Sequence, residues 1–250
     1  MARGRDLAVG RAFLPVAGSE EPVSRVARTG CPLGGRTGRN ACPTLEALAV
    51  FAACQFYLWW VHARFRYGWV LLLAYMISSV AWRRESEQKL GLSLFGSASG
   101  TMRWAGWPVI LVTLPLLAFG YLRGRLGLQA PDAQSLLDFG GYLAWCVLQQ
   151  FALQSFLHNR LMDAFPGRPH FTAALTALMF SSLHLPNPVL VVATLVGGFA
   201  MAEIFARRRN IWVLAALQAL VSTVIFVSLP DEWHHRLRVG AGFYWWEVRR

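Results

Sequence analysis

The sequence is poor in charged residues and poorer still in lysine. Only 15% of its 250 residues are charged, whereas soluble domains carry roughly a quarter. Lys89 is the single lysine. Hydrophobic residues make up 55% of the chain, and the mean hydropathy is +0.39. This composition argues against an ordinary soluble domain and is typical of a polytopic membrane protein.

Paired cysteines are also absent. Cys31, Cys42, Cys54 and Cys146 show no short paired spacing, which argues against both a disulfide framework and a zinc knuckle. The formal charge of +11 comes from arginines that cluster between apolar runs. No basic groove interleaved with aromatic residues accompanies them, so we expect no nucleic-acid partner. We also expect neither a metal nor a cofactor.

Seven apolar runs follow an arginine-rich start. Residues 1–40 hold seven arginines with many glycines and prolines, and we expect a disordered cytoplasmic tail there. We expect residues 41–230 to form an all-α, polytopic membrane helical bundle and residues 231–250 a basic, aromatic tail. About seven to eight transmembrane helices are predicted, from apolar runs at 45–61, 68–82, 107–122, 136–162, 171–184, 188–206 and 211–229.

The basic residues between these runs predict an orientation. Nine of them lie in loops on the side of the N-terminus, and four lie in loops on the opposite side. Because basic loops stay in the cytoplasm, the chain is predicted to be a multi-pass protein of the cell (inner) membrane with a cytoplasmic N-terminus.

Amide and imidazole side chains interrupt three of the apolar runs. Gln149, Gln150 and Gln154 lie in one run, His184 ends another, and Gln218 lies in a third. Lipid offers no water to satisfy such groups, so they must face one another or a wet cavity. We therefore expect three membrane segments to converge on one polar site.

Each of these residues also has a purely structural interpretation. Gln150, Gln154 and His158 are four residues apart and would share one helical face, where amides commonly hold neighbouring helices together. Glu203 precedes Arg207 by one turn, which favours an ion pair within the helix over a catalytic carboxylate. Both the structural and the functional interpretation remain open at this point.

The order and spacing of the polar residues resemble the CPBP family of intramembrane proteases, the CAAX-processing and bacteriocin-processing (Abi-type) group. Its members carry Glu-Glu-x-x-x-Arg, then Phe-x-x-x-His, then His-x-x-x-Asn or a similar residue, on separate membrane helices in that order. Residues 149–154 (Gln-Gln-Phe-Ala-Leu-Gln) align with the first motif and residues 180–184 (Phe-Ser-Ser-Leu-His) with the second. Residues 218–222 (Gln-Ala-Leu-Val-Ser) align with the third, after Arg209-Asn-Ile-Trp212. The resemblance covers about residues 85–225.

The resemblance implies peptide-bond hydrolysis within the membrane by a water that a glutamate activates with help from histidines. It places His184, Gln149, Gln150 and Gln218 at catalytic positions. It also implies substrate-binding positions at Gln154, Phe180 and Ser222. The implied partner is a membrane-embedded peptide or a lipid-linked protein in the bilayer. The departure from the family pattern is consistent, because both Glu positions, the Arg position and one His position are glutamine.

Three functional hypotheses follow. In the first, the chain is an intramembrane endopeptidase with altered chemistry, in which His184 polarises water and the glutamines stabilise an oxyanion. In the second, it is a pseudoprotease that binds a peptide or a lipid tail for immunity, sorting or scaffolding. In the third, it is a metal-dependent hydrolase, which the single motif histidine disfavours because zinc usually needs three protein ligands.

Overall fold

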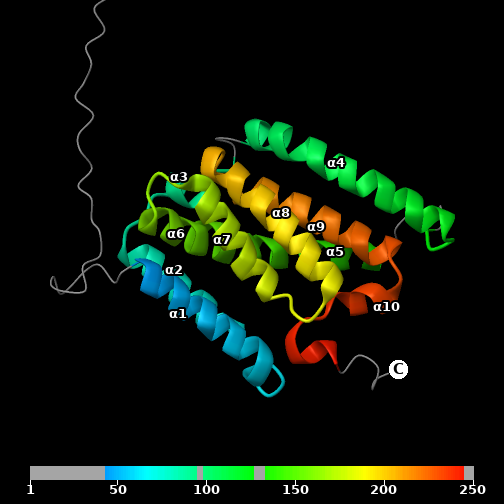
Figure 1. Ribbon diagram of the computed structural model, residues 1–250, viewed down its shortest axis with the longest axis horizontal. Helices are drawn as coiled ribbons and strands as arrows, with labels where there is room; N and C mark the ends of the chain where they lie inside the picture. Colours follow the sequence, from blue (N-terminus) through cyan, green and yellow to red (C-terminus); the bar gives the residue numbers. More distant parts are fainter. Residues whose placement is uncertain (1–42, 95–97, 127–132, 245–250) are drawn as a thin grey trace, which may run out of the picture. The chain divides into compact units, whose positions relative to one another are not determined.

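The computed structural model describes residues 43–94, 98–126 and 133–244, and every regular element among them is helical (Figure 1). The predicted all-α class is confirmed for this part of the chain. The expected tail, residues 1–40, lies outside the described residues. The elements are α1 Pro43–Phe56, η1 Tyr57–Val61, α2 Trp69–Trp82, α3 Glu87–Leu90, α4 Ala98–Leu122, α5 Ala133–Gln150, η2 Phe151–His158, α6 Asn159–Ala164, α7 Pro169–Ser182, α8 Pro188–Arg207, α9 Ile211–Ser228, α10 Asp231–His234, η3 His235–Leu237 and η4 Gly240–Phe243.

Local sequence explains where the later helices begin. The Asn187 side chain accepts a hydrogen bond from the Leu190 backbone N–H at the start of α8, and Pro188 occupies the first turn, where a missing N–H costs nothing. The Asn210 side chain caps α9 in the same way through Val213. These caps fix the short connections that hold α7, α8 and α9 next to one another.

Small residues let these helices approach closely. Gly198 of α8 lies against α7, where an added Cβ would come within 3.2 Å of the Phe180 ring. Gly120 of α4 lies against α9, where an added Cβ would come within 2.8 Å of the Ser228 Cα. Figure 1 shows α4 lying alongside α9, and α5 also packs on α9. Close helix approach at small residues is the usual packing mode in lipid.

A π-helical segment interrupts the helical rod formed by residues 133–164. Residues Phe151–His158 form η2, between α5 and α6. A π-helix makes its backbone hydrogen bonds between residues five apart rather than four. Gln150, Gln154 and His158 are all fully buried but differ in their partners. Gln150 donates to Gln218, His158 pairs with Thr176, and the Gln154 amide has no partner among the described residues.

The expected number of membrane spans is not confirmed. Within the described ranges, four helical segments are long and apolar enough to cross a membrane, namely Pro43–Val61, Ala98–Leu122, Pro188–Arg207 and Ile211–Ser228, and α2 is a shorter apolar helix. α7 has 14 residues. The predicted start of the third run, residue 107, is also wrong, because α4 begins at Ala98. The hydroxyl of Thr101 anchors this early turn by donating to the Arg208 carbonyl.

A buried ion-pair network joins α1, α2 and α6. Arg160 is fully buried, and its Nε lies 3.0 Å from Glu46 Oε2 while its Nη1 lies 2.5 Å from Glu85 Oε1. Arg83 also reaches Glu46, at 2.5 Å, and Ser79 donates to the other oxygen of that carboxylate. The network fastens the N-terminal helices to the end of the rod that carries the glutamines.

Candidate functional site

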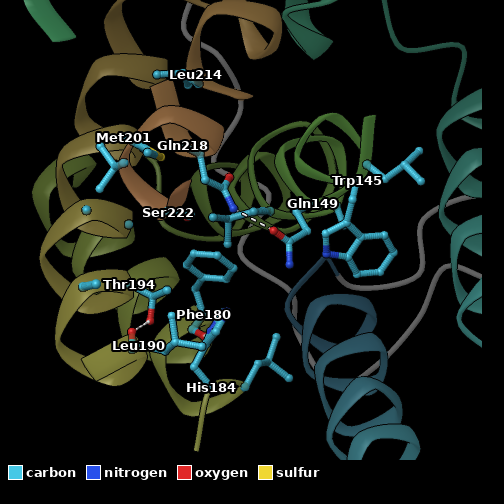
Figure 2. Close-up of a pocket in the computed structure, with 18 of the residues that line it drawn as sticks. Trp145, Gln149, Phe180, His184, Leu190, Thr194, Met201, Leu214, Gln218 and Ser222 are labelled. Atoms are coloured by element: carbon cyan, nitrogen blue, oxygen red, sulfur yellow. Dashed lines mark hydrogen bonds between the residues drawn. The ribbon is translucent and has the colours of Figure 1, made fainter. Parts of the chain in front are cut away.

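A cavity of about 650 Å³ lies between the helices, and side chains from α1, α2, α4, α5, α7, α8 and α9 line it. The lining is mostly apolar. Among the described residues, no Arg, Lys, Asp or Glu lines the cavity. Gln149, Gln218, His184 and Ser222 lie among its few polar residues. Figure 2 shows Gln149, Gln218, Phe180 and His184 gathered around this space from separate parts of the chain.

Three glutamines form one chain of hydrogen bonds at the cavity wall. Gln150 Nε2 donates to Gln218 Oε1 over 2.7 Å, and Gln218 Nε2 donates to Gln149 Oε1 over 2.6 Å. Gln150 is fully buried behind the wall, whereas Gln149 and Gln218 line the cavity. We call this set, Gln149, Gln150 and Gln218, the amide chain. It brings together the residues aligned with the first and third motifs.

A methionine fixes the direction of the amide chain. Gln150 Nε2 lies 3.1 Å from the sulfur of Met201, and a thioether sulfur can only accept a hydrogen bond. The atom of Gln150 that faces Met201 and Gln218 must therefore be the amide nitrogen. Every bond in the chain then runs the same way, which leaves Gln149 Nε2 as the free donor at the cavity end (Figure 2).

His184 offers the complementary group. Its Nδ1 lies 2.8 Å from the Phe180 carbonyl oxygen, which is an acceptor, so Nδ1 carries the proton. In the neutral ring, Nε2 then has a lone pair and can accept a hydrogen bond. The two side chains also contact edge to face, with ring centroids 4.7 Å apart. Phe180 thus positions His184 through both its backbone and its ring.

Gln154 does not join the amide chain. Its side chain is fully buried, but neither its nitrogen nor its oxygen has a hydrogen-bond partner in the described part of the chain. It does not line the cavity either. Ser222, the other position aligned with substrate binding, does line it. The structure therefore places six of the seven predicted residues at the cavity or in the amide chain, whereas Gln154 takes part in neither.

Sequence reasoning missed several contributors to the cavity. Met201 and Thr194 come from one face of α8, at a seven-residue spacing that a helical projection from the cavity side would reveal. Leu237 and Val239 come from the C-terminal segment, for which the sequence indicated no role. The only signal for these two is their apolar character in an otherwise basic tail.

Carboxylates stay away from the cavity. Glu203 of α8 contacts Arg207 Nη1 at 2.6 Å and His170 Nδ1 at 2.7 Å, so the predicted ion pair within the helix is confirmed. In the described part of the chain, no three His, Cys, Asp or Glu side chains lie together in a way that could hold a metal ion.

Comparison with known proteins supports the resemblance. Residues 133–224 match the family model described as type II CAAX prenyl endopeptidase Rce1-like. This range runs from the start of α5 into α9 and includes all three motif segments. No curated protein and no solved structure matches the chain. The match confirms the similarity to the CAAX-processing proteases.

Proposed function

We propose, on the premise that residues 133–224 belong to the type II CAAX prenyl endopeptidase family, that this chain is a pseudoprotease. It is a CAAX-protease-like membrane protein whose cavity binds a peptide or a lipid tail from the bilayer without cleaving a peptide bond. The observation that carries the proposal is the amide chain, which stands where the family has its paired glutamates.

The chemistry of the amide chain supports binding over hydrolysis. A general base must accept a proton near neutral pH, and an amide has no such pKa. The carbonyl oxygen of Gln149 already accepts from Gln218, and that of Gln218 accepts from Gln150. Loss of a general base typically costs about 10² to 10⁴ in rate. Because the amides are neutral and hydrogen-bonded to one another, this part of the cavity wall is stable and contains no unpaired charge.

A second candidate function is slow intramembrane proteolysis. One observation favours it, since His184 lines the cavity with Nε2 free to accept a proton from water. Gln149 Nε2 would then donate to the oxyanion that forms on the scissile carbonyl. In this candidate, His184 alone takes the place of the glutamate and the second histidine.

One experiment separates the two candidates. The full chain, purified into lipid nanodiscs, is incubated with transmembrane and prenylated peptides beside the His184→Ala variant. We expect bound peptide or lipid tail and no product from either protein. A product that forms with the original chain and disappears in His184→Ala would overturn the proposal in favour of slow proteolysis.

A restoration variant tests whether the cavity descends from a protease cavity. The substitutions Gln149→Glu, Gln150→Glu, Gln154→Arg and Gln218→His return the family residues. We expect them, in combination, to produce measurable cleavage of a peptide that the original chain only binds. Adding His184→Ala to the same variant is the matched control, and cleavage should then be lost.

The arginine distribution supports an inner-membrane location with the N-terminus in the cytoplasm. Single cysteines placed in the loops after α1 and after α7, in a chain whose own cysteines are replaced, would report the orientation. A membrane-impermeant thiol reagent added to intact cells should label the first loop. Labelling only after the membrane is opened would contradict the orientation.

A further inference from the structure

The size of the cavity limits what can occupy it. A volume of about 650 Å³ lies within the range of about 300–1,000 Å³ that encloses small-molecule ligands. A helix about 10 Å in diameter would fill this volume within about one and a half turns. The cavity is thus too small for a transmembrane helix but suits a single lipid chain along its apolar walls.

The charge of the lining limits the head group. In the part of the chain that the structure describes, no Arg, Lys, Asp or Glu lines the cavity. An ionised carboxylate or phosphate placed among apolar side chains without a cation is strongly disfavoured. An ammonium head is disfavoured for the same reason, because no carboxylate faces it. The lining therefore selects an uncharged head group.

The polar atoms of the lining specify the head group further. Gln149 Nε2 is a hydrogen-bond donor with no partner in the described part of the chain, and its direction is fixed by Met201 through the amide chain. His184 Nε2 is an acceptor, because Nδ1 donates to Phe180. A hydroxyl group both accepts and donates, so its chemistry matches a lining that offers both a donor and an acceptor.

We propose that the cavity binds a single-chain lipid with an uncharged hydroxyl head group, and that Gln149 selects this head. This inference rests on the proposed function, because it names the ligand class of the same cavity. The amide chain gives Gln149 its selectivity. Because the oxygen of Gln149 already accepts from Gln218, only its donor nitrogen faces the ligand. This nitrogen carries no positive charge, so it favours a neutral oxygen of the ligand over an anionic one.

Photolabelling with a matched pair of probes tests the proposal. The full chain in phosphatidylcholine nanodiscs is exposed to hexadecanol or to hexadecanoic acid, each with a diazirine at the same mid-chain carbon. The experiment runs at about pH 9, where the carboxyl is ionised. We expect the alcohol to label lining residues of α8 and α9 about tenfold more than the acid, a ratio equivalent to about 1.4 kcal/mol. Excess unlabelled hexadecanol should abolish the labelling.

Two variants connect the selectivity to Gln149. Gln149→Met keeps the length of the side chain but removes the donor, and we expect about fivefold less labelling by the alcohol. Gln134→Met makes the same change on the exposed surface of α5, where Gln134 pairs with Asp138. Labelling of this control should equal that of the original chain. Acidifying the sample until the acid is protonated should raise its labelling toward that of the alcohol.

Three results would overturn the inference. They are equal labelling by the ionised acid and the alcohol, unchanged labelling in Gln149→Met, and labelling confined to residues outside the cavity. Cavity labelling by both probes, with no peptide cleavage in the assay described above, would remove only the head-group inference and leave the binding function standing. Peptide cleavage that depends on His184 would remove the proposed function itself.

Discussion

Two buried polar clusters in this molecule satisfy their hydrogen-bonding groups in opposite ways, one with charged side chains and the other with neutral ones. The ion-pair network places Arg160 between Glu46 and Glu85, all of them nearly or fully removed from solvent. The amide chain of Gln149, Gln150 and Gln218 carries no charge at all. Both clusters tie distant helices together, and both lie on or beside the rod of residues 133–164.

The contrast shows that neutrality at the cavity is not a general property of the chain. This fold can hold buried carboxylates, provided that arginines pair with them at close range. The positions that align with the family's Glu and Arg residues hold only amides, whereas the buried Arg160 pairs with carboxylates that hold helices together. Neutrality is therefore specific to the cavity, as expected if the cavity receives an uncharged ligand.

Removing Arg160 should have the largest effect on stability. Arg160→Met would leave the buried carboxylates with one cation each, Glu46 with Arg83 and Glu85 with the more distant Lys89. Breaking a buried pair in this way typically costs about 3–5 kcal/mol. We expect a large drop in the midpoint of thermal unfolding, followed by tryptophan fluorescence in detergent.

Arg125→Met is the matched control for this change. Arg125 pairs with Asp231 at 3.0 Å, and both side chains are about one-third exposed. Exposed pairs contribute about 0–1 kcal/mol, so this variant should unfold close to the original midpoint. Equal effects of the two substitutions would show that the buried network is not a special source of stability.

Placing a charge in the amide chain should have the next largest effect, and the position should decide its size. Gln150→Glu would turn a fully buried donor into an acceptor that faces Gln218 Oε1 and the Met201 sulfur. A buried acceptor that faces only other acceptors lowers the stability of the fold by about 1–3 kcal/mol, and a charged acceptor lowers it by more. Gln149→Glu keeps the oxygen that accepts from Gln218 and changes only the atom on the cavity side.

We therefore expect Gln150→Glu to lower the unfolding midpoint clearly more than Gln149→Glu. The two variants carry the same substitution at adjacent residues, so each is the control for the other. The reverse order would mean that the amide chain runs in the opposite direction and that Gln149 presents its oxygen to the cavity.

The sequence was sufficient to predict the helical class and the convergence of the glutamines. Apolar runs require helices in lipid, and amides within them require partners, so Gln149, Gln150 and Gln218 had to meet something polar. Periodicity did not predict that Gln154 lies outside the amide chain, nor the π-helical segment at 151–158 that contains it. The count of spans is not confirmed, since run length alone does not show which helices cross the bilayer.

The ion-pair network was not foreseen for a different reason. Glu46 and Arg160 are separated by more than a hundred residues, and each one alone is typical of a helix end facing water. Only the packing of α1 on α6 brings them together. Long-range pairing of this kind leaves no local signature, whereas Glu203 and Arg207, one helical turn apart, were correctly paired from spacing alone.

Gln154→Met should have a smaller effect and the opposite sign. Gln154 is fully buried with neither amide atom hydrogen-bonded to the described residues. Replacing an unsatisfied buried amide by an apolar side chain of similar length removes a penalty of about 1–3 kcal/mol. We expect the unfolding midpoint to stay the same or rise. A clear fall would show that Gln154 has a polar partner in the membrane, which would place it with the amide chain after all.

A buried histidine at the end of α10 should add the smallest effect, one that depends on pH. His234 is buried, its Nε2 lies 3.1 Å from the Leu229 carbonyl oxygen, and its backbone oxygen accepts from Asn187. Burial lowers the pKa of His234 below its usual value. The hydrogen bond to Leu229 and the charge of Asp231 raise this pKa, and the charge of Arg125 lowers it further.

Because the folded pKa lies below the unfolded one, the unfolded chain takes up the proton first as the pH falls. The contribution of His234 to stability is therefore complete above about pH 6.5 and is lost as the pH drops from there toward the lowered pKa. His234→Gln, which cannot titrate, should flatten this part of the curve of unfolding midpoint against pH. If the variant keeps the same decline, His234 has the same pKa in the folded and the unfolded chain, and other groups cause the loss of stability.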